Sequence, residues 1–534
     1  MSDFSPEPPR SSLRTGKTAV VNWLGERWRD TGLARADRAL LIIFLAAFAI
    51  SWIARVTVAV DLPLWLDEAW TGAIVGQSSW SATVHQIWLD ANAPLYYLFM
   101  HAWTGVFGLS NEALRFPSLI FSLATPLVVV ATRIDGLKVE DRLALAAVLT
   151  VWVEGLVQAD EARCYALLTL LATCQTLAFA RLMTGPSVRR TAIWAALGAL
   201  VIVTHYQAVM LGAAQGIIYL RAHQVKAVRT WPGGLAFLPA FGVLAWHLPK
   251  LLQFARPDVA WYDLADSGTL VYTMEFLTGS WWLYVLPVCG ICFLAWRQMR
   301  RHLLVAEQAG PETPWLTGIA AVLGLLLMAG IGFFRPSFTY RYATPFVPGI
   351  SLLLVLGARA LTPAFPGARA GLMLMALLHS AEWADRSAGH LWHPYSYEIA
   401  SYDLLATHPS RLVFIWDHPA QRVETPEQYV AAGGFFFHRA GSTAEVTPVM
   451  VKPGEDANLR LLNQAKEPGA VILWLYDTHV RGTSAAVYPP RIESLDPSFG
   501  CHNYGRGRIG VLACARSWAG GAWPSGRPEG RSAK

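Results

Sequence analysis

The sequence predicts a membrane-embedded bundle of α-helices with a small α/β domain at its C-terminal end. Of the 534 residues, 54% are hydrophobic and only 15% are charged, whereas soluble domains carry roughly 25% charged residues. Apolar runs close to the ~20 residues that cross a hydrocarbon core recur between Ala39 and Leu378. Beyond about residue 385 the composition changes, and short strands and helices alternate.

The apolar runs predict eleven transmembrane helices. They lie at about 39–58, 116–132, 143–157, 164–182, 191–204, 207–220, 232–249, 276–296, 316–334, 343–358 and 370–380. The first run starts late for a cleaved signal peptide and does not end in a clear cleavage site. We therefore expect it to be retained as the first span.

One further apolar stretch, Pro94–Gly108, has the length of a re-entrant or interfacial segment rather than of a span. If it does not cross the membrane, the basic loops that follow all lie on the side of the basic N-terminus, as the positive-inside rule requires. We therefore expect a membrane-lying helix within a long first periplasmic loop, 59–114. Residues 1–38 are then cytoplasmic, and 39–384 form the membrane domain of a bacterial inner-membrane protein.

The remaining chain, about 385–517, is predicted to fold as a periplasmic α/β domain. Arg411–Trp416 and Ala470–Leu475 read as buried strands, and a helix is expected near 425–437. Cys501 and Cys514 could form a disulfide in an oxidising periplasm, although two reduced cysteines are the alternative. Residues 518–534, rich in Gly, Ser, Pro and Arg, are expected to be disordered.

The first group of polar residues follows the first span. Asp67 and Glu68 begin an amphipathic helix at the membrane surface. Asp67 could simply cap this helix and complement its dipole. Alternatively, a carboxylate in a low-dielectric interface can have a raised pKa and act as a general base toward a hydroxyl.

Two further groups fall on the same face of the membrane. Gln158–Tyr165 carries Asp160, Glu161 and Arg163. A solvated turn with Asp160 as a helix N-cap would explain it, but the expected topology puts this loop on the same face as Asp67, which favours a shared site. Arg335–Tyr342 places arginines outside, where guanidinium groups could bind a phosphate or anchor the chain at lipid headgroups. His205 lies at another external turn, where it could bind a polar substrate or act as an interfacial anchor.

Several other classes of function lack support. The sequence has no Walker-type loop, no His-Glu-x-x-His, no Gly-x-Ser-x-Gly and no paired CxxC motif. The net charge of +6 is explained by the basic cytoplasmic loops, so a nucleic-acid partner is not expected.

Six motifs in order resemble the polyprenyl-phosphate-sugar-dependent membrane glycosyltransferases of the GT-C fold, near the protein mannosyltransferase, aminoarabinose transferase and rhizobial Rgt groups. The motifs are Asp67-Glu68, Asn92-Ala-Pro-Leu-Tyr-Tyr, Leu114-Arg-Phe-Pro-Ser, Ala159-Asp-Glu-Ala-Arg-Cys-Tyr, Thr204-His-Tyr and Tyr340-Arg-Tyr. Together they cover about 60–350, while the chain after 385 matches nothing recognisable.

The resemblance implies a reaction in which an acceptor hydroxyl attacks the anomeric carbon of the sugar, with inversion, and a lipid phosphate leaves. Asp67 would be the base. Glu68, Asp160, Glu161, His205 and Tyr342 would orient the acceptor or donor, and Arg163 and Arg341 would bind the phosphate. Adjacent helix positions do not share a face, so the sequence does not say which acid of each pair points inward.

Three questions stay open at the level of sequence. The acids could ligate Mg²⁺ or Mn²⁺ through oxygen, although near relatives of this pattern mostly need no metal. The sugar and the acceptor, which could be a glycan, a lipid or a protein, are not specified. A transporter or flippase for a lipid-linked envelope precursor is the main alternative, and an assembly component with a periplasmic interaction domain is a third.

Overall fold

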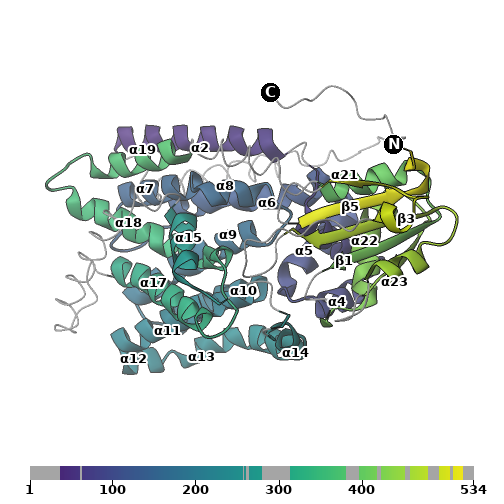
Figure 1. Ribbon diagram of the computed structural model, residues 1–534. Helices are drawn as coiled ribbons and strands as arrows, with labels where there is room; N and C mark the ends of the chain where they lie inside the picture. The colour runs from purple at the N-terminus through teal and green to yellow at the C-terminus, as the bar shows by residue number, and fades with distance from the viewer. Residues whose placement is uncertain are drawn as a thin grey trace, which may run out of the picture.

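The computed structural model describes residues 37–520 except 60–62, 257, 260–263, 279–312, 381–395, 418–421, 451–456, 479–491 and 505–508. The basic N-terminal segment, most of the expected span 276–296 and the end of the chain after residue 520 therefore lie outside the described residues. What is described is a helical bundle with a small mixed sheet at one end (Figure 1).

Twelve main helices of the described chain build the bundle. They are α2 (Arg38–Ala59), α6 (Asn111–Ala131), α7 (Val139–Thr150), α8 (Val153–Ala159), α9 (Tyr165–Thr184), α10 (Val188–Thr204), α11 (Val209–His223), α14 (Leu238–Phe254), α15 (Ser267–Thr278), α17 (Thr313–Gly332), α18 (Val347–Leu361) and α19 (Ala368–Ser380). Two single turns, α12 (Val225–Val228) and α13 (Trp231–Gly234), connect α11 to α14.

Six helical segments of the described chain are long and apolar enough to cross a membrane, and a seventh is obtained if α7 and α8, bent by 60° at their junction, count as one span. Large apolar side chains on α2 and α14, such as Ile42, Trp52 and Leu252, are exposed on the protein surface. Such surfaces suit a lipid solvent. The chain is thus a multi-pass membrane protein, and the number of eleven spans stays a prediction.

The basic loops of the bundle gather at one end. Arg181, at the end of α9, donates to the carbonyl of Arg133 at 2.9 Å, and Arg190, at the start of α10, donates to the carbonyl of Arg181 at 2.8 Å. Helix α6 begins at Asn111 and, with 21 residues, spans about 31 Å. Its first turn is therefore at the opposite end of the bundle from these loops, beside the α/β domain (Figure 1).

Three helices lie between α2 and α6: α3 (Leu66–Val75), α4 (Trp80–Leu89) and α5 (Pro94–Phe107). Helix α5 begins with a proline, whose fixed φ suits the first helical position, and ends at Gly108 with φ +80°. At 14 residues it extends only about 21 Å, less than a membrane crossing. It is the helix expected at 94–108.

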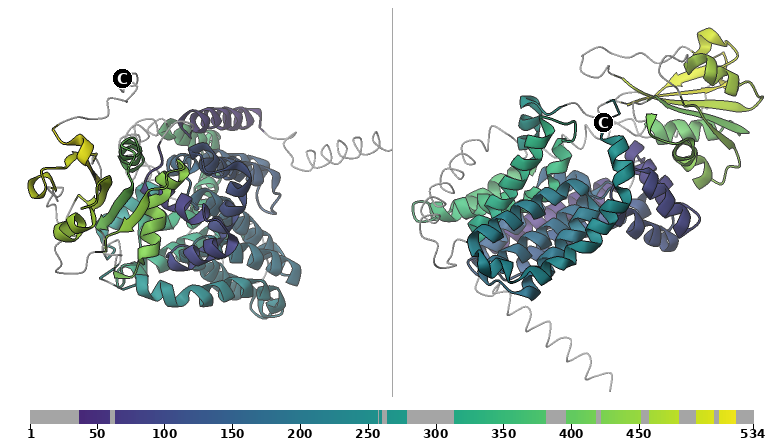
Figure 2. Two further views of the ribbon diagram at one scale, coloured as in Figure 1. Left: turned by 90° about the vertical axis from the view of Figure 1, so that its right-hand side faces the viewer. Right: turned by 90° about the horizontal axis from the view of Figure 1, so that it is seen from below.

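The C-terminal domain is a five-stranded sheet with helices on both faces (Figure 2). Its elements are α21 (Ser396–Leu405), β1 (Arg411–Asp417), α22 (Pro426–Arg439), β2 (Glu445–Pro448), α23 (Ala457–Gln464), β3 (Ala470–Asp477), α24 (Ile492–Leu495), β4 (Gly500–Asn503) and β5 (Ile509–Ala515). The strand order is β2-β1-β3-β5-β4; β1, β2 and β3 are parallel, and β5 is antiparallel to β3 and β4.

The two central strands coincide with the apolar runs that predicted them. Residues Leu412–Trp416 and Ala470–Tyr476 are buried, because β1 and β3 are the parallel pair at the centre of the sheet and helices cover both of its faces. A disulfide joins Cys501 of β4 to Cys514 of β5 at directly paired positions.

The α/β domain packs against the bundle. A single apolar core continues from Trp70 of α3 and Tyr96 of α5 into the domain, where it includes Phe414, Trp416 and Phe435. Figure 1 shows the sheet and its helices beside α4 and α5. The first periplasmic loop expected from the sequence is therefore a layer of helices between the bundle and the domain.

Candidate active site

Helix α3 presents two adjacent carboxylates to opposite environments. Asp67 and Glu68 both lie in its first turn, where negative charge complements the helix dipole. The Glu68 carboxylate also accepts a hydrogen bond from the Trp65 backbone N–H at 3.1 Å, which satisfies one of the free amides at the helix start.

Glu68 is fully buried in an ion pair with Arg115 of α6. The guanidinium donates from Nε to Oε1 at 2.7 Å and from Nη2 to Oε2 at 2.6 Å, and both side chains are at most 3% exposed. The backbone N–H of Ala162 donates to the same carboxylate at 2.8 Å. Glu68 thus connects α3, α6 and the loop before α9.

Asp67 has a looser environment. Its side chain is 28% exposed, and its carboxylate lies 3.7 Å from the Nη2 of Arg163. Arg163 Nη1 also donates to the Asp67 carbonyl at 3.3 Å and to the Thr71 hydroxyl at 3.5 Å. Asp67 and Thr71 are one helical turn apart and so share a face. These long contacts leave the Asp67 carboxylate accessible to another partner.

The loop between α8 and α9 brings a second acidic pair to the same place. Burial raises the pKa of Asp160 well above its ordinary value, and its Oδ1 has no hydrogen-bond partner among the described residues. Burial also raises the pKa of Glu161 to about 7, opposed chiefly by the charge of Arg341. The Glu161 carboxyl is therefore partly protonated near neutral pH, unlike an exposed carboxylate.

Arg341 is the second residue of the 3₁₀ segment η4 (Tyr340–Phe346), and its guanidinium lies over the ring of Trp65, 5.2 Å from its centre. The next residue, Tyr342, meets the ring of His205 at 4.7 Å. Burial lowers the pKa of His205 to about 4, so its imidazole is neutral at physiological pH. Its Nδ1 is buried and has no hydrogen-bond partner in the described part of the chain.

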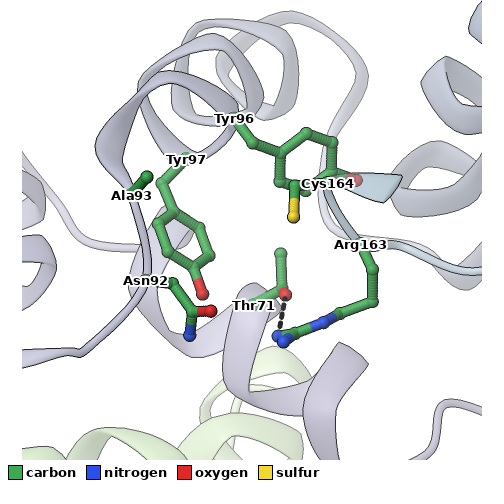
Figure 3. Close-up of a pocket in the computed structure, with 7 residues that line it drawn as sticks. All are labelled: Thr71, Asn92, Ala93, Tyr96, Tyr97, Arg163 and Cys164. Atoms are coloured by element: carbon green, nitrogen blue, oxygen red, sulfur yellow. Dashed lines mark hydrogen bonds between the residues drawn. The ribbon is translucent and has the colours of Figure 1, made fainter. Parts of the chain in front are cut away.

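A small pocket lies against Arg163 and Thr71 (Figure 3), the two residues whose side chains contact Asp67. It is lined by Thr71, Asn92, Ala93, Tyr96, Tyr97, Arg163 and Cys164. Asp90 fixes two of these lining side chains, because its carboxylate accepts hydrogen bonds from the Tyr97 hydroxyl at 3.0 Å and from the Asn92 amide at 2.9 Å. The cavity volume is about 10 Å³, which is about the space of one water molecule.

No protein-family model matches the chain, and no curated protein matches it. Solved structures do. ArnT from Cupriavidus metallidurans bound to undecaprenyl phosphate is 13% identical, over 90% of this chain and 98% of that one, with a TM-score of 0.54. The apo state of the same protein gives 0.56 with the same identity and the same shares. This chain has the GT-C fold of ArnT.

The GT-C fold predicted from the sequence motifs is therefore confirmed. The oligosaccharyltransferase AglB from Archaeoglobus fulgidus, in complex with an inhibitory peptide and a dolichol-phosphate, matches at 10% identity over 82% of this chain and 69% of that one, with a TM-score of 0.45.

Within this GT-C fold, most of the residues singled out from the sequence converge. Arg163 contacts Asp67 directly, and the charges of Glu161 and Arg341 interact with each other and with Asp67. His205 and Tyr342 form an adjacent contact. Cys501 and Cys514, by contrast, pair on the C-terminal sheet, away from these groups.

The sequence patterns did not identify several residues of this site. Thr71 carries a detectable signal, because it stands four residues after Asp67 on a predicted helix. Arg115 belongs to the Leu114-Arg-Phe-Pro-Ser motif, which gave it no role, although an arginine at the edge of an apolar run is itself unusual. Asp90 gave no signal, since its role depends on how the chain folds back at Asn92 and Tyr97. In the described residues, no group of three or more His, Cys, Asp or Glu side chains could hold a metal ion.

Proposed function

We propose that the protein is a membrane glycosyltransferase that moves a sugar from a polyprenyl-phosphate carrier to an acceptor hydroxyl, with inversion at the anomeric carbon. The observation that carries the proposal is the accessible Asp67 carboxylate, 3.7 Å from the Arg163 guanidinium beside the pocket. The fold supports it, since ArnT has been solved with undecaprenyl phosphate bound.

In the proposed reaction, Asp67 removes the proton of the acceptor hydroxyl as its oxygen attacks the anomeric carbon. The bond between that carbon and the phosphate oxygen breaks, and the lipid phosphate leaves with the electron pair. A single displacement of this kind inverts the anomeric centre. Negative charge grows on the departing phosphate, where preorganised cations are most effective.

Arg163 and Arg341 are the cations proposed for the phosphate. A guanidinium is always charged and can donate two parallel hydrogen bonds to phosphate oxygens. Arg163 has a further donor to offer, because its buried Nε has no hydrogen-bond partner in the described structure. Arg341 lies at the N-terminus of α3, where its guanidinium makes a cation–π contact with the Trp65 ring.

The remaining groups are assigned supporting roles. Glu68 orients the site by fixing α3 to α6 through Arg115. Asp160 and Glu161 orient the acceptor or donor from the loop before α9, and the neutral His205, with Tyr342, offers hydrogen bonds to sugar hydroxyls. A transporter would place substrate groups near the middle of the membrane, whereas these residues lie at helix ends and loops.

We place the site on the periplasmic side of a bacterial inner membrane, with the N-terminus in the cytoplasm. Two observations support this orientation. The basic loops with Arg133 and Arg181 gather at the opposite end of the bundle, where the positive-inside rule puts the cytoplasm. The Cys501–Cys514 disulfide suits an oxidising compartment.

The test compares Asp67→Asn with wild type in membranes supplied with radiolabelled polyprenyl-phosphate sugars, following transfer to cell-envelope acceptors. Loss of a general base lowers the rate by about 10²- to 10⁴-fold. Asp135→Asn, an exposed carboxylate at the far end of the bundle, is the matched control, and immunoblots confirm protein levels. Transfer by Asp67→Asn at the wild-type rate would show that Asp67 only caps α3. Repeating the assay with EDTA tests whether Mg²⁺ or Mn²⁺ takes part.

A further inference from the structure

The C-terminal domain contacts the helix that carries Asp67. Phe435 of α22 lies so close to α3 that a Cβ atom at Gly72 would sit 2.3 Å from the Phe435 ring. On the same helix, Trp70 packs edge-on against Trp416 of β1, with ring centres 5.2 Å apart. The approach of α22 to α3 therefore requires that residue 72 have no side chain.

The domain also holds the residues that lead into α3. The backbone N–H of Leu64, three residues before Asp67, donates a hydrogen bond to the Glu398 carboxylate of α21. Glu398 is 5% exposed. It is paired with Arg439 of α22 at 2.6 Å and accepts from Asn111, at the start of α6, at 3.2 Å. Arg439 in turn donates to the Asn111 side chain at 2.6 Å.

These contacts matter because α3 cannot set its own position. A helix of 10 residues is marginal in isolation and depends on packing. The long contact between Asp67 and Arg163 constrains the carboxylate only weakly. Helix α3 also contacts Arg115 and α5. The domain supplies the remaining support: Phe435 packs on α3 at Gly72, after Asp67 in the chain, and Glu398 binds Leu64, before Asp67.

We propose that the C-terminal domain is a positioning part of the active site, with Phe435 and Glu398 placing α3 so that Asp67 reaches the acceptor hydroxyl. This inference rests on the proposed function. It gives the domain a role in the chemical step rather than in tethering a partner. Phe435 and Glu398 are positioning residues, because they act through α3 and do not line the pocket.

The experiment uses full-length Phe435→Ala, Gly72→Ala and the double variant. Misplacing a reactive group by about 1 Å can cost 100-fold in rate, so we expect each single variant to lose roughly 10- to 100-fold in kcat. The KM for the lipid-linked donor should stay within about twofold, because the hydrogen bonds, ion pair and ring contact of Arg163 and Arg341 in the described residues are made to Asp67, Thr71 and Trp65, outside the domain. In the double variant the space left by Phe435 accepts the new methyl group, and a large part of kcat should return.

Hydrogen exchange supplies a readout that does not depend on activity. In Phe435→Ala, the backbone amides of α3 should exchange at least several-fold faster, while those of α9 should keep their wild-type rates. Arg411→Gln is the control within the same domain, since Arg411, at the start of β1, forms ion pairs with Glu445 and Glu467 and none with α3 among the described residues. It should leave kcat and α3 exchange unchanged.

The outcomes are separable. Wild-type kcat in folded Phe435→Ala and Gly72→Ala would overturn the inference, and so would unchanged exchange in α3. If Phe435→Ala does not fold, Glu398→Gln takes its place, with an expected fall in kcat and faster exchange near Leu64; wild-type values for both would overturn the inference. If the wild-type protein transfers no sugar from any lipid-phosphate donor, the proposed function fails, while the exchange measurement still decides whether the domain holds α3.

Discussion

Asp67 and Glu68 are neighbours in the chain but have opposite surroundings. Glu68 is completely buried and bonded to Arg115 at 2.6 Å, whereas Asp67 is 28% exposed and 3.7 Å from its nearest cation, Arg163. The buried Glu68–Arg115 pair, here called the closed pair, joins α3 to α6. The Asp67–Arg163 pair, here called the open pair, borders the pocket. The difference suggests a division of labour: a rigid ion pair fixes the helix, so that the adjacent carboxylate can remain free for chemistry.

The largest effect is expected from Glu68→Gln. Removing one partner of a buried ion pair leaves the other charge uncompensated, at a cost of about 3–5 kcal/mol in the free energy of unfolding. Asp67→Asn should cost less than about 1 kcal/mol, because only a favourable charge at the helix N-terminus is lost. Thermal unfolding of both variants in detergent measures the difference.

Equal stability of these two variants would break the comparison, since the closed pair would then contribute no more than the open one. A Glu68→Gln protein that is destabilised but still transfers sugar at the wild-type rate would keep Glu68 as an anchor. Such a result would also show that Asp67 keeps its catalytic position when the Glu68–Arg115 ion pair is lost.

The sequence identified the acidic pair but could not assign the two roles. The assignment depends on Arg115 and Ala162, which are 47 and 94 residues from Glu68 along the chain. Periodicity shows only that adjacent helix positions face different ways. Which of the two directions holds a buried cation is decided by tertiary packing, and that is absent from any local pattern.

Other parts of the fold were easier to predict because their causes are local. Strands β1 and β3 follow from continuous apolar runs, and α5 follows from the length of the run that starts at Pro94. The contact between the C-terminal domain and α3 could not be predicted in this way. Its hydrogen bond from Leu64 to Glu398 spans 334 residues, and the need for glycine at position 72 arises only once Phe435 is in place.

A smaller, pH-dependent effect is expected at Glu161, whose carboxyl has a pKa raised by burial from 4.5 to about 7. The charged groups that act on it are Arg341, Glu68, Arg163 and Asp67. Well below pH 7 the carboxyl is mostly neutral, and its charge does not compete for Arg341. Above pH 7 the carboxylate competes with the phosphate for this arginine, so the KM for the donor should rise between pH 6 and pH 8, by roughly threefold to tenfold.

Glu161→Gln is neutral at every pH and should keep the low donor KM across this range. Stability gives an independent check with a defined sign. Because the folded-state pKa of Glu161 is the higher one, the folded protein binds more protons between pH 4.5 and 7, and its stability falls as the pH rises through this window. The variant should lack this part of the decline. A wild-type donor KM that is flat from pH 6 to pH 8 would exclude competition between Glu161 and the phosphate.

The smallest effect is expected from Thr71→Val, which keeps the shape of the side chain and removes only its hydroxyl. That hydroxyl accepts from Arg163 at 3.5 Å and donates to the Asp67 carbonyl at 3.0 Å. The first contact is long, so its loss should cost about 0.5–1 kcal/mol, or roughly two- to fivefold in kcat/KM. If Asp67 and Arg163 form an open and adjustable pair, Arg163 settles onto the carboxylate without its third contact, and stability is nearly unchanged. If Thr71→Val instead lowered the free energy of unfolding as much as Glu68→Gln does, the Asp67–Arg163 pair would be as rigid as the Glu68–Arg115 pair.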